Sequence, residues 1–179
     1  SSAASDVYKR QAALLEEGGV TVHFSEQYAD APTQTGGLTP LLLDGSSTVL
    51  LDVGGNDTGA RLIGGCAHLL RTAAVYFVVN PYRPWSGTAA HIDGTLSAVL
   101  RASRLQAPRF LLNPNLGRHT TAQEYLDGLA QGLALLTPYV AVEAAAVPDA
   151  LYTQVRSRTG LPLLRITPRI TVPETGLDE

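Results

Sequence analysis

Strand signals and helix signals alternate along most of this chain. Short runs of β-branched and other apolar residues are each followed by a segment of helical composition. Because parallel strands are joined by right-handed helical crossovers, the alternation predicts an α/β fold with a mostly parallel sheet and helices on both faces. We expect strands at 20–24, 48–53, 74–79, 109–112, 139–147 and 161–166, and helices at 12–17, 57–70, 88–104, 121–136 and 149–158.

The ends of two predicted helices carry specific signals. Gly18 and Gly19 follow the first helical segment, where glycine commonly ends a helix. Thr121 and Glu124 have the spacing of a capping box, in which each side chain binds a backbone N–H at the helix start. The segment 41–43 is either a short helix or the end of a strand.

Composition excludes several classes of protein. The chain has 179 residues, the size of one domain, and its single cysteine, Cys66, excludes an intrachain disulfide and a cysteine-based metal site. No apolar run is long enough to span a membrane, and the first residues lack the order of a secretory signal. The net charge of −3 gives no overall electrostatic reason to bind nucleic acid. We therefore expect a cytoplasmic protein without a membrane span.

The first eleven residues read differently from the rest. SSAASDVYKRQ is the in-frame translation of a transposase adapter used in shotgun sequencing, although a natural helical leader is the alternative. The chain contains no methionine, and its only lysine, Lys9, lies in this segment. We predict a non-native leader at 1–11, one domain at 12–173 and a tail at 174–179, with the reading frame entered inside a gene.

Ligands of parallel α/β sheets bind beyond the carboxyl ends of the strands, and the sequence places unusual residues there. The first group is Asp52 with Gly54 and Gly55, which follows the apolar run 48–51. A carboxylate at the end of a buried strand can hold a Mg²⁺-bound water, and glycines let a terminal phosphate approach the backbone. The alternative is that Asp52 caps the next helix and the glycines form a tight turn.

The second group is Asn113-Pro114-Asn115, which follows the strand predicted at 109–112. An asparagine amide can donate to and accept from an adenine edge at once, although Asn and Pro are also ordinary turn residues. The loop 80–85 carries Arg83 and the only tryptophan, and it is either a contact for phosphate or a partner, or a rigid exposed turn. The four histidines are scattered and are interpreted as non-ligands.

The glycine-rich signatures of complete nucleotide sites are absent. No G-x-x-x-x-G-K-[ST] loop occurs, and no G-x-G-x-x-G follows a strand. The series LLDVGGNDTGAR, VVNPYRPWSGT, LLNPNLGRHTTAQEYLDG and LPLLRITPR nevertheless resembles a bacterial group of ATP-binding proteins among the ParA/MinD/CobQ-like P-loop NTPases of the SIMIBI class. The resemblance runs from about residue 11 to about residue 173. Arg118 and His119 depart from the acidic residues that the group often has there.

The resemblance implies a three-layer fold of the P-loop NTPase type that lacks its N-terminal P-loop strand and its second strand. It implies ATP and Mg²⁺ as ligands, with Asp52 as the Walker-B acid near the metal and Gly54 and Gly55 at the γ-phosphate. Asn113, with Asn115, would face adenine. The turn at Pro148 would line the base pocket.

The parent protein is then expected to be an ATP-dependent switch or an ATPase that forms a homodimer and binds a protein partner not readable from the sequence. This chain, without the phosphate loop, is expected to bind nucleotide poorly and to be inactive alone. Two alternatives stay open: a binding or scaffold domain that never used nucleotide, and an ATP-dependent amide synthetase of the CobQ/CobB type. A phosphate loop encoded upstream of residue 11 would distinguish them.

Overall fold

The computed structural model describes residues 2–23, 38–54, 57–106 and 108–167. Within them, β1 (Tyr76–Val79), β2 (Arg109–Leu112), β3 (Val142–Pro148) and β4 (Leu163–Ile166) form a four-stranded sheet in the order β1-β2-β3-β4. Every neighbouring pair of strands is parallel. The register between β2 and β3 shifts once, which makes a bulge in β3. The predicted α/β class with a parallel sheet is therefore confirmed.

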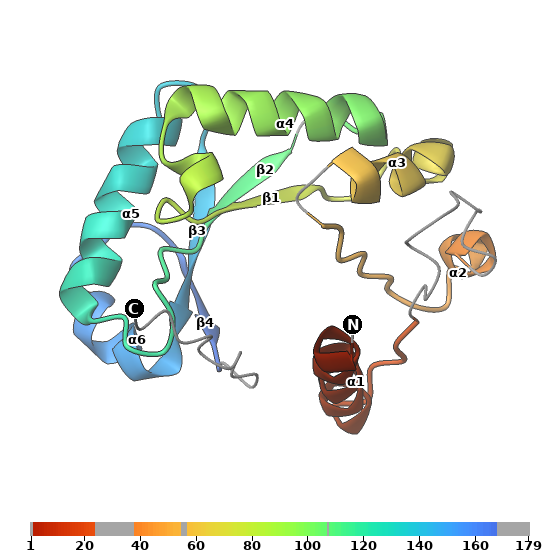
Figure 1. Cartoon of the computed structure of the whole chain (residues 1–179), viewed down its shortest axis with the longest axis horizontal. Coiled ribbons are helices and arrows are strands. Elements are labelled where there is room, and N and C mark those ends of the chain that lie inside the picture. Colours follow the sequence, from red (N-terminus) through yellow and green to blue (C-terminus); the bar gives the residue numbers. More distant parts are fainter. Residues whose placement is uncertain (1, 24–37, 55–56, 107, 168–179) are drawn as a thin grey trace.

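Three helices connect the strands and cover one face of the sheet. They are α4 (Ala89–Ser103), α5 (Ala122–Leu136) and α6 (Asp149–Val155). Because the strands follow one another across the sheet in chain order, right-handed crossovers place all three helices on the same side. Figure 1 shows them as an arc around that side. Their buried residues join those of the strands in one core cluster: Val79, Ile92, Phe110, Leu112, Tyr125, Leu129, Leu136, Ala145, Val147, Leu151 and Val155.

The opposite face of the sheet carries no helix in the part of the chain that the structure describes. Val79 points into the core and is fully buried, whereas Val78 points to the other face and is 48% exposed. Leu164 of β4 shares that face through the strand register and is also 48% exposed. Within the described residues, β1 also has an unpaired edge. Parallel sheets are normally covered on both faces, so the third layer predicted from the sequence stays a prediction.

The remaining helices precede β1 in the chain, except for one short 3₁₀ helix between β1 and α4. They are α1 (Ser2–Glu17), α2 (Leu38–Leu43), α3 (Asp57–Gly65) and two short 3₁₀ helices, η1 (Ala67–Leu69) and η2 (Pro84–Ser86). In Figure 1, α1 stands apart from the sheet, and α3 lies beside α4. A second apolar cluster holds α2, α3 and the segments before β1 and β2 together. Its buried residues are Ile63, Cys66 and Leu70, and the partly buried residues packed against them are Leu38, Leu42, Leu51, Leu69 and Leu105.

The signals for the helix ends are confirmed. Thr121 accepts a hydrogen bond from the backbone of Glu124, and the carboxylate of Glu124 accepts one from the backbone of Thr121. Gly19 has a φ of +80° and ends α1 through a hydrogen bond from its N–H to the carbonyl of Glu16. The helix α1 crosses the predicted leader boundary at residue 11 without interruption. Cys66 is buried, as expected of a small apolar residue.

Two strand predictions are wrong. Residues 48–53 and the described part of 20–24 form no strand, and the predicted helix 57–70 is divided into α3 and η1 after Gly65. A strand exists only where a neighbouring strand accepts its backbone hydrogen bonds, and no described strand lies beside residues 48–53. Leu50 is accordingly 93% exposed. Local composition favoured an extended conformation there but could not supply the partner.

No helix among the described residues combines the length and apolar character needed to cross a membrane.

Candidate functional site at the carboxyl ends of the strands

The loops that follow β1, β2 and β3 meet at one edge of the sheet, because the three strands are parallel. Asn80 follows β1, and its carboxamide joins the first two loops. Its Nδ2 donates to the carbonyl of Asn115 at 2.7 Å, and its Oδ1 accepts from the backbone N–H of Tyr82 at 3.1 Å. The hydroxyl of Ser86 donates to the carbonyl of Asn80. Asn80 thus fixes the loop 80–86 to the loop after β2.

Tyr82 fixes the same loop to α5. Its hydroxyl donates to the carbonyl of Glu124, and its ring lies against Gly128, where a Cβ would come within 2.5 Å of the ring. Burial and the nearby acidic side chains raise the pKa of Tyr82. Trp85 makes an edge contact with Phe77 at 6.3 Å between ring centroids and stays 39% exposed. The loop is therefore a hydrogen-bonded turn with an exposed tryptophan, and its contact with phosphate or a partner stays a prediction.

Asn115 has a structural part in the loop after β2. Its carboxamide oxygen accepts from the backbone N–H of Gly117 at 2.6 Å and from the hydroxyl of Thr120 at 3.2 Å. The hydroxyl of Thr120 also accepts from the N–H of Leu116 at 3.0 Å. These contacts are those of a side-chain-stabilised turn. The carboxamide oxygen of Asn115 is occupied, which leaves only its NH₂ group for a ligand.

Asn113 differs from its neighbour. Its backbone N–H donates to the carbonyl of Val79 at 2.9 Å, which continues the pairing of β1 with β2 by one residue. Its side-chain oxygen is buried and has no hydrogen-bond partner among the described residues. Such an atom costs roughly 1–3 kcal/mol, so each occurrence in a folded protein needs an explanation.

A second buried polar atom without a partner lies on α5, the helix that follows this loop. The hydroxyl of Tyr125 makes no hydrogen bond within the described residues, and the side chain is fully buried. Desolvation raises the pKa of Tyr125 to about 12. The phenol therefore stays protonated at neutral pH and does not act as a base.

The loop after β3 carries a polar cluster that the sequence analysis did not find. Pro148 ends β3 and precedes α6, and Asp149 is the first residue of that helix. Asp149 accepts from Nε of Arg165 at 2.9 Å and from the hydroxyl of Thr167, and these bonds lower its pKa. The guanidinium of Arg165 lies over the ring of Tyr152 at 4.7 Å. No local spacing links residues sixteen or more positions apart, so only strand pairing reveals this cluster.

The structure does not bring Asp52 together with these loops. Asp52 is exposed, and the adjacent Leu51 packs in the second apolar cluster near Leu70 and Leu105, which precede β1 and β2. Gly54 lies against Gly59 at the start of α3, and Gly55 lies outside the described residues. The described part of the chain holds no group of three His, Cys, Asp or Glu side chains placed to bind a metal.

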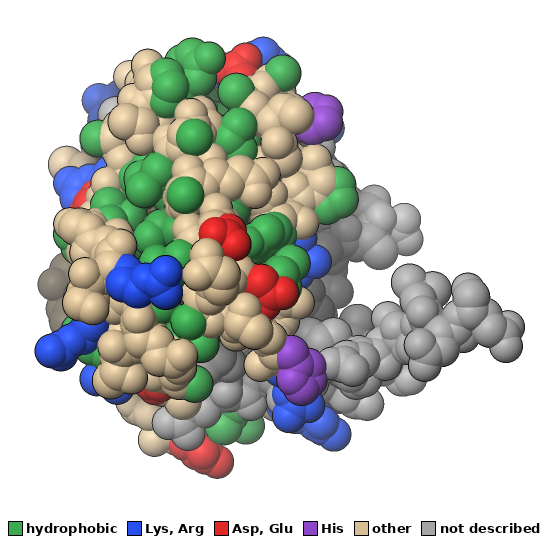
Figure 2. All heavy atoms as spheres, turned by 90° about the vertical axis from the view of Figure 1, so that its left-hand side faces the viewer, with side chains coloured by type: hydrophobic (Ala, Val, Ile, Leu, Met, Phe, Trp, Pro, Cys, Tyr) green, Lys and Arg blue, Asp and Glu red, His purple; other side chains and the backbone are tan. Residues whose placement is uncertain are grey.

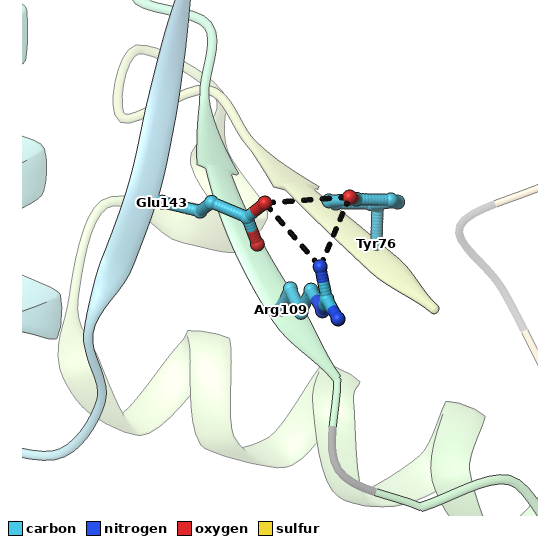
Figure 3. Close-up of polar contacts among 3 residues, drawn as sticks. All are labelled: Tyr76, Arg109 and Glu143. Atoms are coloured by element: carbon cyan, nitrogen blue, oxygen red, sulfur yellow. Dashed lines mark hydrogen bonds and ion pairs between the residues drawn. The ribbon is translucent and has the colours of Figure 1, made fainter. Parts of the chain in front are cut away.

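A separate polar cluster lies on the open face, near the amino ends of the strands. Figure 3 shows Tyr76, Arg109 and Glu143 pointing toward one another from β1, β2 and β3. Nη1 of Arg109 lies 3.4 Å from Glu143, and the hydroxyl of Tyr76, with that carboxylate, raises the pKa of Arg109. Both charged side chains are about half exposed, so solvent weakens their ion pair. We assign this cluster no chemistry.

The surface over α5 and α6 shows no concentration of one charge. In Figure 2, basic and acidic side chains are scattered there among apolar and neutral ones.

The fold and the site together define an α/β domain with a parallel sheet and a polar edge where three strands end. Comparison with family models, curated proteins and solved structures finds no match for it.

Proposed function

We propose that this chain is the base-binding part of an ATP-binding α/β domain of the ParA/MinD/CobQ-like class, from a parent that uses ATP as a switch or hydrolyses it. Three features support the proposal: the parallel sheet, the polar loops at its carboxyl edge and the motifs that resemble this class. The observation that carries it is the side-chain oxygen of Asn113 at the end of β2, which is buried and has no partner among the residues that the structure describes.

The chemistry of Asn113 fits an adenine edge. A free acceptor can take the exocyclic amino group of adenine, and the NH₂ of the same amide can donate to a ring nitrogen. Guanine presents a carbonyl and a ring N–H in the equivalent positions, so it would match only an amide turned by 180°. We expect discrimination because the loop, and not the amide, would shift to bring the buried Oδ1 to the base. ATP, when bound, would supply the phosphates on which a switch or hydrolysis depends.

Within the described ranges, the helix-free face of the sheet and the unpaired edge of β1 support the proposal that further strands complete the domain. Val78 and Leu164 expose apolar surface that a parallel sheet normally covers. The apolar segment 48–53 likewise has no partner strand among the described residues. A P-loop strand beside β1 would pair with the edge of that strand, and the helix that follows it would cover the open face. It would also give residues 48–53 the neighbour they need to form a strand.

Mg²⁺ is assigned to Asp52 only through this completed arrangement. Magnesium is commonly held by one or two carboxylates together with phosphate oxygens and water, so a single aspartate is compatible with such a site. Asp52 is exposed in this chain. Its proposed role depends on residues 48–53 forming a strand that points the carboxylate toward the phosphates.

The test is an NMR titration of this chain with adenosine and, separately, with guanosine. We expect weak binding of adenosine, with the largest changes of chemical shift at Asn113 and at the residues next to Pro148. Guanosine should not cause these changes. Asn113→Asp should abolish the response because a carboxylate cannot donate to the ring nitrogen. Gln154→Glu is the matched control, since it makes the same amide-to-carboxylate change on an exposed side chain of α6. Equal responses to the two nucleosides, or loss of binding only in the control, would refute the assignment.

A further inference from the structure

A hollow of about 670 Å³ lies at the end of the sheet away from the carboxyl-end loops. Its walls come from the segment between α3 and β1, including Leu70 and Val75, and from the segment between α4 and β2, including Leu105. Both segments precede strands, so the hollow is at the amino edge. Its volume falls within the range of small-molecule sites, which is about 300–1,000 Å³.

The polar side chains that line this hollow are basic or neutral. They are His68, Arg71, Arg104 and Gln106, and no carboxylate lines the hollow. This contrasts with the chain as a whole, whose net charge is −3. Neither guanidinium makes an ion pair or hydrogen bond with any residue that the structure describes. Two arginines without an acidic partner in the described part of the chain therefore face the same hollow.

The backbone conformation of Arg104 is a second observation at this hollow, separate from the charge of its lining. Arg104 has a φ of +58° and is the only non-glycine residue with a positive φ in the described ranges. It ends α4 through a hydrogen bond from its N–H to the carbonyl of Leu100 at 2.9 Å. Glycine or asparagine usually occupies this left-handed position because a larger side chain is strained there. The helix dipole favours a cation at this end but does not require one at the strained residue itself.

We propose that this hollow is a binding site for a small molecule that carries a phosphate group on an apolar body. A guanidinium presents paired donors that match phosphate oxygens, and the forks of Arg71 and Arg104 would share the anion. Leu70, Val75 and Leu105 supply an apolar wall for the rest of the ligand. The site lies at the other end of the strands from the proposed base site, so it does not depend on the proposed function.

Calorimetric titration of the full chain with phenyl phosphate tests the proposal, with sodium chloride holding the ionic strength constant. We expect binding with shifts of the amide NMR signals of Gly64, Gly65 and Val75. Inorganic phosphate should bind more weakly because it lacks the apolar body, and phenol should not bind because it lacks the charge. Arg71→Gln and Arg104→Gly should each weaken binding roughly tenfold or more, as expected for loss of one charge-assisted contact.

Arg104→Gly separates binding from folding. Glycine eases the left-handed backbone, so this variant should melt at or above the temperature of the parent chain while losing affinity. Arg101→Gln is the matched control, because Arg101 lies on α4 one turn earlier and does not line the hollow. Unchanged affinity in both test variants, an equal loss in the control, or no binding of phenyl phosphate above the effect of salt would overturn the proposal.

Discussion

Replacing Asn113 and Asn115 should change stability in opposite directions, although the two residues share one loop. In Asn113→Leu, the side chain keeps nearly the same size and loses a buried acceptor that has no partner within the described structure. Removing an unsatisfied buried acceptor stabilises the folded chain by about 1–3 kcal/mol. Part of this gain is offset, because the partly exposed NH₂ group and its hydration are lost as well. We expect a net gain of about 1 kcal/mol.

Asn115→Ala removes the hydrogen bond from the N–H of Gly117 at 2.6 Å. The hydroxyl of Thr120, 3.2 Å from the same oxygen, keeps the carbonyl of Gly117 at 2.8 Å as its acceptor. At about 0.5–1.5 kcal/mol for one bond, the loss is about 0.5–1.5 kcal/mol. The two variants should therefore differ by about 1.5–2.5 kcal/mol. At about 2–4 °C per kcal/mol for a domain of this size, their melting temperatures should lie roughly 3–10 °C apart.

Urea unfolding followed by circular dichroism measures both free energies of unfolding on the same protein preparation. The m-values should be unchanged, because neither substitution alters the surface exposed on unfolding. If Asn113→Leu destabilises the chain as much as Asn115→Ala does, then the oxygen of Asn113 has a partner, and the base-site argument loses its carrying observation.

Three further predictions concern packing, hydroxyl burial and pH. Gly128→Ala should destabilise the chain by about 1–3 kcal/mol, because its Cβ would lie 2.5 Å from the ring of Tyr82. Gly94→Ala meets no atom within 4 Å and should stabilise α4 by about 1 kcal/mol. Thermal melts of the two variants test whether their stabilities change in opposite directions. Tyr125→Phe removes a buried hydroxyl without a described partner and should be neutral or stabilise by about 1 kcal/mol, and a loss above that amount in calorimetry would reveal a hidden partner. The backbone and hydroxyl of Thr121 lower the pKa of Glu124 in the folded chain. The contribution of the Glu124 carboxylate to the free energy of unfolding is therefore complete above the unfolded pKa of about 4.3, and it is lost as pH falls through the folded pKa. Urea midpoints from pH 6 to pH 3 should therefore fall less steeply in Glu124→Gln, and identical slopes would contradict this sign.

Local signals predicted those parts of the fold that depend on neighbours in the chain. The strand 109–112 matches β2 at both ends, and the capping box at Thr121 begins α5 as expected. The same local reasoning failed at residues 48–53, where the composition favours a strand but no neighbouring strand is present among the described residues. A strand is a property of a pair of segments, so composition alone cannot establish it.

The candidate site divides in the same way. The sequence by itself determined that Asn113 and Asn115 follow one strand and that Pro148 follows another, because strand positions and turn residues are encoded locally. Only the tertiary structure decided that Asn115 holds the turn while the oxygen of Asn113 stays without a described partner. It also decided that Asp149 meets Arg165. These outcomes depend on which atoms strand pairing and helix packing bring within hydrogen-bonding distance, and a linear pattern carries no record of those distances.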